Sequence, residues 1–134
     1  MKSREETRIC LITLCNVPRE RLPYNGQWYL SNLDLRGRVF REFDLSAANL
    51  TGINLSGADL HAANLSDANL CDASLNGANL RQTCLFRTTL RNADLSSAKG
   101  LTTRQLREGF DLIEAILDPG RYADVMAALR GVRG

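Results

Sequence analysis

Leucine recurs at every fifth position through the middle of the chain, in stretches such as ANLSDANLCDASLNGANL at residues 63–80. Five residues of an α-helix advance about 500°, so leucines at this spacing would spiral around a helix and form no apolar face. In a flat strand, residues five apart point to opposite sides of the sheet. The spacing therefore predicts a chain that turns a corner once in every unit of five residues, so that all the leucines share one interior.

The pattern keeps one register from residue 28 to residue 97. Most units have a small residue two positions before the central residue and a short polar residue directly before it, and several have a glycine two positions after it. Alanine beside leucine suits a narrow interior, and glycine accepts the positive φ that tight turns require. The central residues are Leu35, Phe40, Leu45, Leu50, Leu55, Leu60, Leu65, Leu70, Leu75, Leu80, Leu85, Leu90 and Leu95.

These units resemble the pentapeptide-repeat family, whose consensus is A(D/N)LXX, over residues 28–97, which are about half of the chain. The resemblance implies an all-β solenoid, a right-handed quadrilateral β-helix with four units per coil, in which residues twenty apart stack. About 3.5 coils at about 4.8 Å each give a length of roughly 17 Å. Arg38 stands at an inward position. Either its charge reaches solvent at the open first coil, or the regular coils begin later, near Phe43.

Residues 1–27 precede the repeat, and we expect them to close its first end. The run ICLITL is apolar, short and partly β-branched, which predicts a capping strand. Pro18, Pro23 and the Asn25-Gly26 pair then predict a loop. We expect neither a secretory signal nor a membrane span, because the apolar run is short and contains polar residues.

Residues 98–134 change to helical spacing. Thr102 or Thr103 can serve as the N-cap of a first helix, and Asp118 can cap a second helix. We interpret the helices as an α-helical cap over the last coil. A second interpretation, compatible with the first, gives one apolar stripe to a two-fold contact between copies of the chain. The first stripe comprises Leu106, Phe110, Ile113 and Leu117, and the second, the candidate dimer contact, comprises Tyr122, Val125, Met126 and Leu129.

Catalytic chemistry is sparse in this sequence. The one histidine, His61, stacks with Arg41 and Arg81 at twenty-residue spacing on the expected outer surface. We interpret His61 as exposed and idle, and the alternative is a surface anion stripe of these three residues. No nucleotide-binding motif or zinc-ligand spacing is present, so we expect no enzyme, no cofactor and no metal. The four cysteines are expected to be free thiols in a reducing cytoplasm.

Charge separates the remaining classes of function. Residues 28–97 contain seven acidic residues against six arginines, a net charge of −1, and the whole chain is +2. A coil of about 4.8 Å would need nearly three uncompensated negative charges to match duplex DNA, which carries one per about 1.7 Å. We therefore predict a noncatalytic protein-interaction or scaffold module with an unknown protein partner. The alternative, implied by the family, is a DNA-mimicking, gyrase-binding protein of the quinolone-resistance type. Direct nucleic-acid binding is not expected, because the basic residues lie at both ends without aromatic interleaving.

Overall fold

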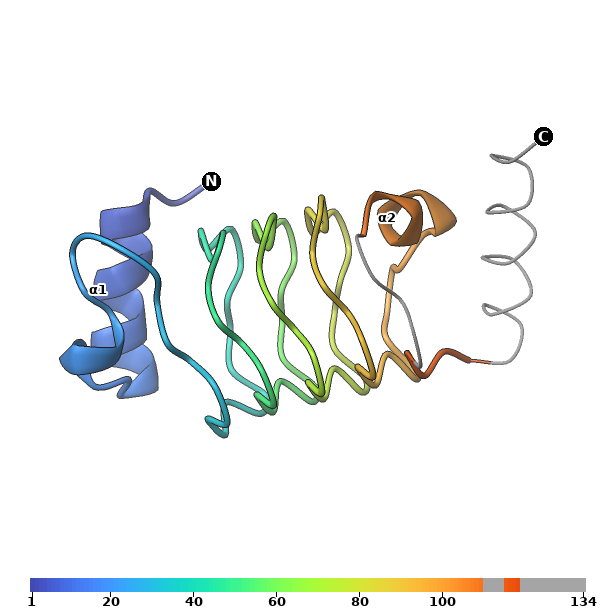
Figure 1. Ribbon diagram of the computed structural model, residues 1–134, viewed down its shortest axis with the longest axis horizontal. Helices are drawn as coiled ribbons and strands as arrows, with labels where there is room; N and C mark the ends of the chain where they lie inside the picture. The colour runs from blue at the N-terminus through green and yellow to red at the C-terminus, as the bar shows by residue number, and fades with distance from the viewer. Residues whose placement is uncertain (110–114, 119–134) are drawn as a thin grey trace.

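A computed structural model of the protein describes residues 1–109 and 115–118. Its helices are α1 (Arg4–Cys15), the short 3-10 helix η1 (Arg19–Arg21) and α2 (Thr103–Glu108). Between η1 and α2 the chain winds into coils that lie side by side along the long axis, with α1 at one end and α2 towards the other (Figure 1). None of the helices within the described residues is long and apolar enough to cross a bilayer.

The coils are joined by isolated parallel β-bridges between residues twenty apart, and the described residues form no longer strand. The first bridge joins Tyr29 to Asn49, and the series continues at this separation to the bridge between Asn79 and Lys99. The predicted stacking of residues twenty apart is therefore confirmed. Four units of five residues make one coil, so each coil has four sides.

A left-handed backbone residue forms each corner. The second residue after every central residue, from position 32 to position 97, has φ between 56° and 69°. At one such corner, the Ala48 amide donates to the Leu45 carbonyl at 3.3 Å and closes a four-residue turn around Ala47. Glycine holds only some of these positions, so the stacking of the coils must stabilise this strained conformation in other residues.

The central side chains fill the interior of the coils. Each central residue from position 35 to position 95 is at most 5% exposed, and burying each leucine contributes roughly 1.5–3 kcal/mol. In the first coil the rings of Phe40 and Phe43 meet edge-on, with centroids 5.5 Å apart. Arg38 is exposed while its carbonyl accepts the Asp59 amide at 2.9 Å. The coil is thus already regular at Arg38, and its charge reaches solvent.

The prediction of a capping strand within residues 1–27 was wrong, because this segment forms helix α1. Ser3 caps the helix, and its side chain accepts from the Glu6 amide at 3.1 Å. The buried face of α1 contains Thr7 and Arg8 as well as Leu11, so it is not an apolar stripe. Leu11 joins the same buried cluster as the coil leucines. The strand-like apolar run is therefore split between the two faces of a helix.

The prediction for the C-terminal segment was right at its start and wrong at its end. Thr102 caps α2 in a capping box with Gln105. The helix ends at Glu108 with Gly109 as its C-cap, and Ile116 forms a parallel bridge with Asp94 of the last coil instead of continuing the helical stripe. The physical reason is the open edge of that coil, whose backbone groups pair with Ile116. The predicted stripe residues Phe110 and Ile113 and the candidate dimer contact Tyr122, Val125, Met126 and Leu129 lie outside the described residues.

Candidate interaction surfaces

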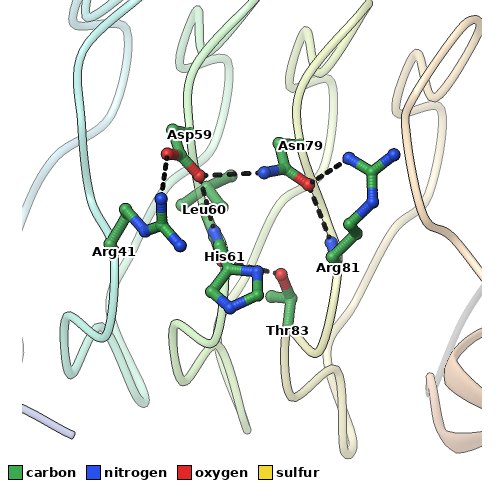
Figure 2. Close-up of polar contacts among 7 residues, drawn as sticks. All are labelled: Arg41, Asp59, Leu60, His61, Asn79, Arg81 and Thr83. Atoms are coloured by element: carbon green, nitrogen blue, oxygen red, sulfur yellow. Dashed lines mark hydrogen bonds and ion pairs between the residues drawn. The ribbon is translucent and has the colours of Figure 1, made fainter.

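The outer side chains form straight columns along the solenoid, because residues twenty apart stack. One column contains the three residues of the predicted anion stripe, Arg41, His61 and Arg81, which lie in successive coils (Figure 2). His61 is half-buried, whereas both arginines are exposed. The structure therefore brings the three residues to one side of the molecule.

The arginines of this column turn towards the neighbouring column of polar residues (Figure 2). Arg41 forms an ion pair with Asp59 at 3.6 Å, and Arg81 donates to Asn79 at 3.2 Å. Asn79 in turn donates to Asp59 at 3.1 Å, which links the two coils. Arg41 is thus partly compensated by a carboxylate, and anion binding by this stripe stays a prediction.

The polar residue before each centre also holds its own turn. The Asp59 carboxylate accepts the His61 amide at 3.1 Å, and Asn64 accepts the Ser66 amide at 3.0 Å in the same way. This use of Asp and Asn in turns matches their local hydrogen-bonding preference. Much of the recurrent acidic and amide chemistry of the repeat therefore serves the backbone.

Several acidic residues of the coils form ion pairs with arginines, which the net charge of the sequence does not reveal. Asp34 pairs with Arg36 at 2.8 Å, and Asp67 pairs with Arg87 at 3.2 Å. Hydrogen bonds from Arg36 hold the pKa of the Asp34 carboxyl below its usual range. These contacts compensate negative charge within the surface itself.

Large apolar side chains are exposed on different sides of the coils. Tyr29 is 50% exposed, Val39 59% and Phe86 52%. Tyr29 and Val39 are two units apart and so lie on opposite sides of a four-sided coil, and Phe86 lies on a third. Singly exposed apolar residues of this kind are normal on protein surfaces. The leucine pattern gave no signal for them, because they occupy outward positions of the repeat.

The cysteines are distributed between α1 and the coils. Cys15 is buried in α1, and burial raises the pKa of its thiol. Cys10, Cys71 and Cys84 are half-buried and unbridged. Within residues 1–109 and 115–118, no three His, Cys, Asp or Glu side chains gather as they would around a metal ion.

Comparison with known proteins identifies the family. The family described as Pentapeptide repeats matches residues 29–65 and 53–92, in 8 copies. The pentapeptide repeat protein alr5209 from Nostoc PCC 7120 is 32% identical over 82% of this chain and 94% of its own, with a TM-score of 0.46. The chain belongs to the pentapeptide-repeat family, as its repeat predicted. Proteins of this family are right-handed β-helical solenoids and are generally noncatalytic.

Two further solved structures match part of the chain. HetL from the cyanobacterium Nostoc sp. strain PCC 7120, described as involved in heterocyst differentiation regulation, is 31% identical over 67% of this chain, with a TM-score of 0.39. The match spans only 42% of the length of HetL. QnrB1, a plasmid-mediated fluoroquinolone resistance protein, is 16% identical over 75% of this chain and 63% of its own, with a TM-score of 0.26. No curated protein matches the chain in sequence.

Proposed function

We propose that this chain is a noncatalytic protein-interaction or scaffold module in the cytoplasm. In this proposal a right-handed β-helix of about 3.5 coils, closed at both ends, presents its outer sides to a protein partner. The observation that supports it is the division of the repeat into a filled apolar interior and straight outer columns of polar side chains. The polar side chains available for binding therefore lie on a regular outer surface.

The rigidity of this surface favours binding. A single unit of the repeat is anchored in both directions, because the Asn64 amide donates to Phe43 at 2.8 Å and the Leu65 amide donates to Cys84 at 2.9 Å. Side chains on such a unit are already positioned before a partner arrives. Little backbone ordering then opposes association, which is the advantage of a preorganised surface.

The alternative function is mimicry of DNA towards gyrase. Residues 43–80 favour it, since they contain four acidic residues and no lysine or arginine. Arginines outside this stretch nevertheless reach two of these acids, because Arg41 pairs with Asp59 and Arg87 pairs with Asp67. A DNA mimic needs uncompensated negative charge, so we place this function second.

The proposal can be tested by changing one side of the coils at a time. Four full-length variants would each carry substitutions on a single side: Ser46→Arg with Ser66→Arg, Thr51→Arg with Cys71→Arg, Ser56→Arg with Asn76→Arg, and Arg41→Glu with Arg81→Glu. Proteins crosslinked to the parent chain in native cells would be compared with those crosslinked to each variant. We expect one variant to lose a specific partner while the other three retain it. Retention of every partner by all four variants would contradict binding through the repeat.

The alternative has its own assay. We expect the chain, at modest molar excess, neither to inhibit gyrase supercoiling nor to protect gyrase from a quinolone. Potent activity in either assay would favour the mimic. That activity should then fall when the carboxylates are neutralised in the variant Asp59→Asn with Asp67→Asn.

A further inference from the structure

The dipeptide Asn-Gly occurs twice in the chain, as Asn25-Gly26 and as Asn76-Gly77. An asparagine before glycine can lose its side-chain amide without an enzyme. The glycine backbone nitrogen attacks the side-chain carbonyl carbon, a C–N bond forms, and ammonia leaves. Water then opens the resulting succinimide to aspartate or isoaspartate. Glycine favours the attack because it has no Cβ and is conformationally free.

Asn76-Gly77 is held in a corner between two coils. The Gly77 amide donates to the Ser96 carbonyl at 3.1 Å, and the Asn76 side-chain amide donates to the Ser96 hydroxyl at 2.6 Å. Gly77 also has the corner value of φ, 69°. Both the attacking nitrogen and the leaving amide are therefore engaged with the next coil, and attack requires this corner to open.

Asn25-Gly26 lies in an exposed loop whose two flanks are anchored. Two hydrogen bonds join these flanks across the loop. The Trp28 indole nitrogen donates to the Pro23 carbonyl at 3.3 Å, and the Tyr29 amide donates to the Arg21 carbonyl at 2.9 Å. Between these anchors, the Gly26 amide has no acceptor within the described part of the chain. A Cβ at Gly26 would meet nothing within 4 Å. The space around Gly77 is equally open, so the free amide of Gly26 is what distinguishes the two sites.

We propose that Asn25 is a site of spontaneous deamidation, with water as co-reactant, and that coil stacking protects Asn76 from the same reaction. The product places a carboxylate beside Tyr24, whose ring lies 4.0 Å from the Arg8 guanidinium. It lowers the formal net charge of +2 by one unit. Isoaspartate also lengthens the backbone of the loop that joins η1 to the first coil.

The test is to incubate the full-length protein at mildly alkaline pH and follow both sites by peptide mapping with mass spectrometry. Isoaspartate would be identified separately by labelling with a protein isoaspartate methyltransferase. Because two hydrogen bonds must break at Asn76, we expect Asn25 to react faster by about tenfold or more. In denaturant the two rates should converge, since both dipeptides are then equally free. Equal rates in the folded protein, or faster reaction at Asn76, would overturn the proposal.

Two variants separate the causes. Ser96→Ala removes the hydroxyl partner of Asn76 and should accelerate reaction there without changing the rate at Asn25. Gly26→Ala should slow reaction at Asn25 and leave Asn76 unaffected. Unchanged reaction at Asn25 in Gly26→Ala, with the fold verified by circular dichroism, would contradict the promotion of attack by the conformational freedom of Gly26.

Discussion

The two ends of the coil stack leave different backbone groups without a partner. Amides of central residues donate towards the following coil, as Leu45 does to the Asn64 carbonyl at 2.8 Å. The first coil therefore leaves carbonyls facing outward, together with the amides of the residues before its centres. The last coil leaves the amides of its central and corner residues, together with the carbonyls of the residues two before its centres. The segments that cover the two ends must differ accordingly.

At the first end, α1 and the residues before it supply mainly donors. Arg4 donates to the Ser46 carbonyl at 2.9 Å, and the Lys2 amide donates to the Glu42 carbonyl at 2.8 Å. Thr7 provides the complementary group, because its hydroxyl accepts the Asp44 amide at 2.8 Å. A cationic and hydroxyl-bearing helix face thus matches an edge that consists largely of carbonyls.

At the last end, the covering segments supply acceptors for coil amides, and Gln105 and the Ile116 amide also donate to coil carbonyls. Carbonyls of Glu108 and Ile116 accept the amides of Arg87 and Leu95, both at 2.8 Å. The Asp118 carboxylate accepts the Ser97 amide at 3.0 Å. The difference teaches that the cover of each end must match the positions of the donors and acceptors left open by that edge, as well as its apolar area, so the two covers are not interchangeable.

The largest effect is expected from a charge placed in the leucine interior, which supports both ends of the solenoid. Leu65→Arg would place a cation at a fully buried position between the two ends. We expect loss of cooperative folding, at a cost of more than about 4 kcal/mol, because an unpaired charge would be buried.

Thermal unfolding followed by circular dichroism would measure this effect. Ser66→Arg, one position later and pointing outward, is the matched control and should cost about 1 kcal/mol or less. A cooperative transition for Leu65→Arg within a few degrees of the parent would disprove the inward position of Leu65.

Removing the segments that cover the last coil tests whether the solenoid stays folded without them. A chain ending at residue 97 loses the acceptors for the Arg87 and Leu95 amides and uncovers Leu90. We expect it to aggregate or unfold, because an open edge of this kind is a template for association. Light scattering would show the change.

The matched control is a chain ending at residue 118, which retains Ile116 and Asp118. We expect this chain to keep the fold and to lose any dimer formed through residues 119–134. A monomeric, fully stable chain ending at residue 97 would show that α2 and residues 115–118 are not needed at this end.

Single capping side chains at the two ends should differ in magnitude. Gln105 is buried and donates to two carbonyls, those of Leu80 at 2.7 Å and Thr83 at 3.0 Å. Gln105→Leu should therefore cost about 2–4 kcal/mol, since two acceptors lose their partner. Thr7→Val strands only the Asp44 amide and should cost about 1–3 kcal/mol.

Urea unfolding of both variants would rank the two effects. The conservative variants Gln105→Glu and Thr7→Ser keep an oxygen at each position, but only Thr7→Ser keeps the hydrogen bond to the coil. Rescue by Gln105→Glu would contradict donation as the role of Gln105.

The smallest effect is expected at an exposed carboxylate of the first coil. Arg36 lowers the pKa of Asp34 in the folded protein. A lowered folded-state pKa stabilises the fold at pH values above the unfolded pKa, and the contribution is lost as the pH falls through the folded value. We therefore expect a slight loss of stability on acidification that Arg36→Gln reduces, with carbon NMR titration of Asp34 as the direct measurement. An unchanged Asp34 titration in Arg36→Gln would exclude this pairing.

The body of the fold was predictable because one constraint repeats in every unit. Leucine spacing, small neighbours and corner residues all indicate the same turn, so an exception such as Arg38 does not change the register. The ends were less predictable because each is determined by contacts with the coil edge. Thr7 and Arg8 are polar residues on a buried face, which hides the helical period of α1. The Ser3 cap was the available local signal.

The C-terminal segment shows the same limit. Helical spacing from Leu106 onward continued past Glu108, where α2 ends with Gly109 as its C-cap. Ile116 pairs with the coil because the edge offers the Leu95 amide and the Ala93 carbonyl, a property of the fold and not of the segment. The outer columns were predictable in position, but the partners of Arg41 and Arg81 depended on side-chain directions that spacing does not give.

Because each unit contains one left-handed corner, each unit adds one quarter of a coil to the solenoid. A gene that gained one unit of five codons would rotate everything downstream by one side, so α1 and α2 would no longer keep their relative orientation. Four units gained together would restore that orientation and lengthen the stack by one layer. The solenoid can therefore evolve in length by whole coils without disturbing the alignment of its ends. Insertion or loss of a single unit would instead rotate one end relative to the other by one side of the coil.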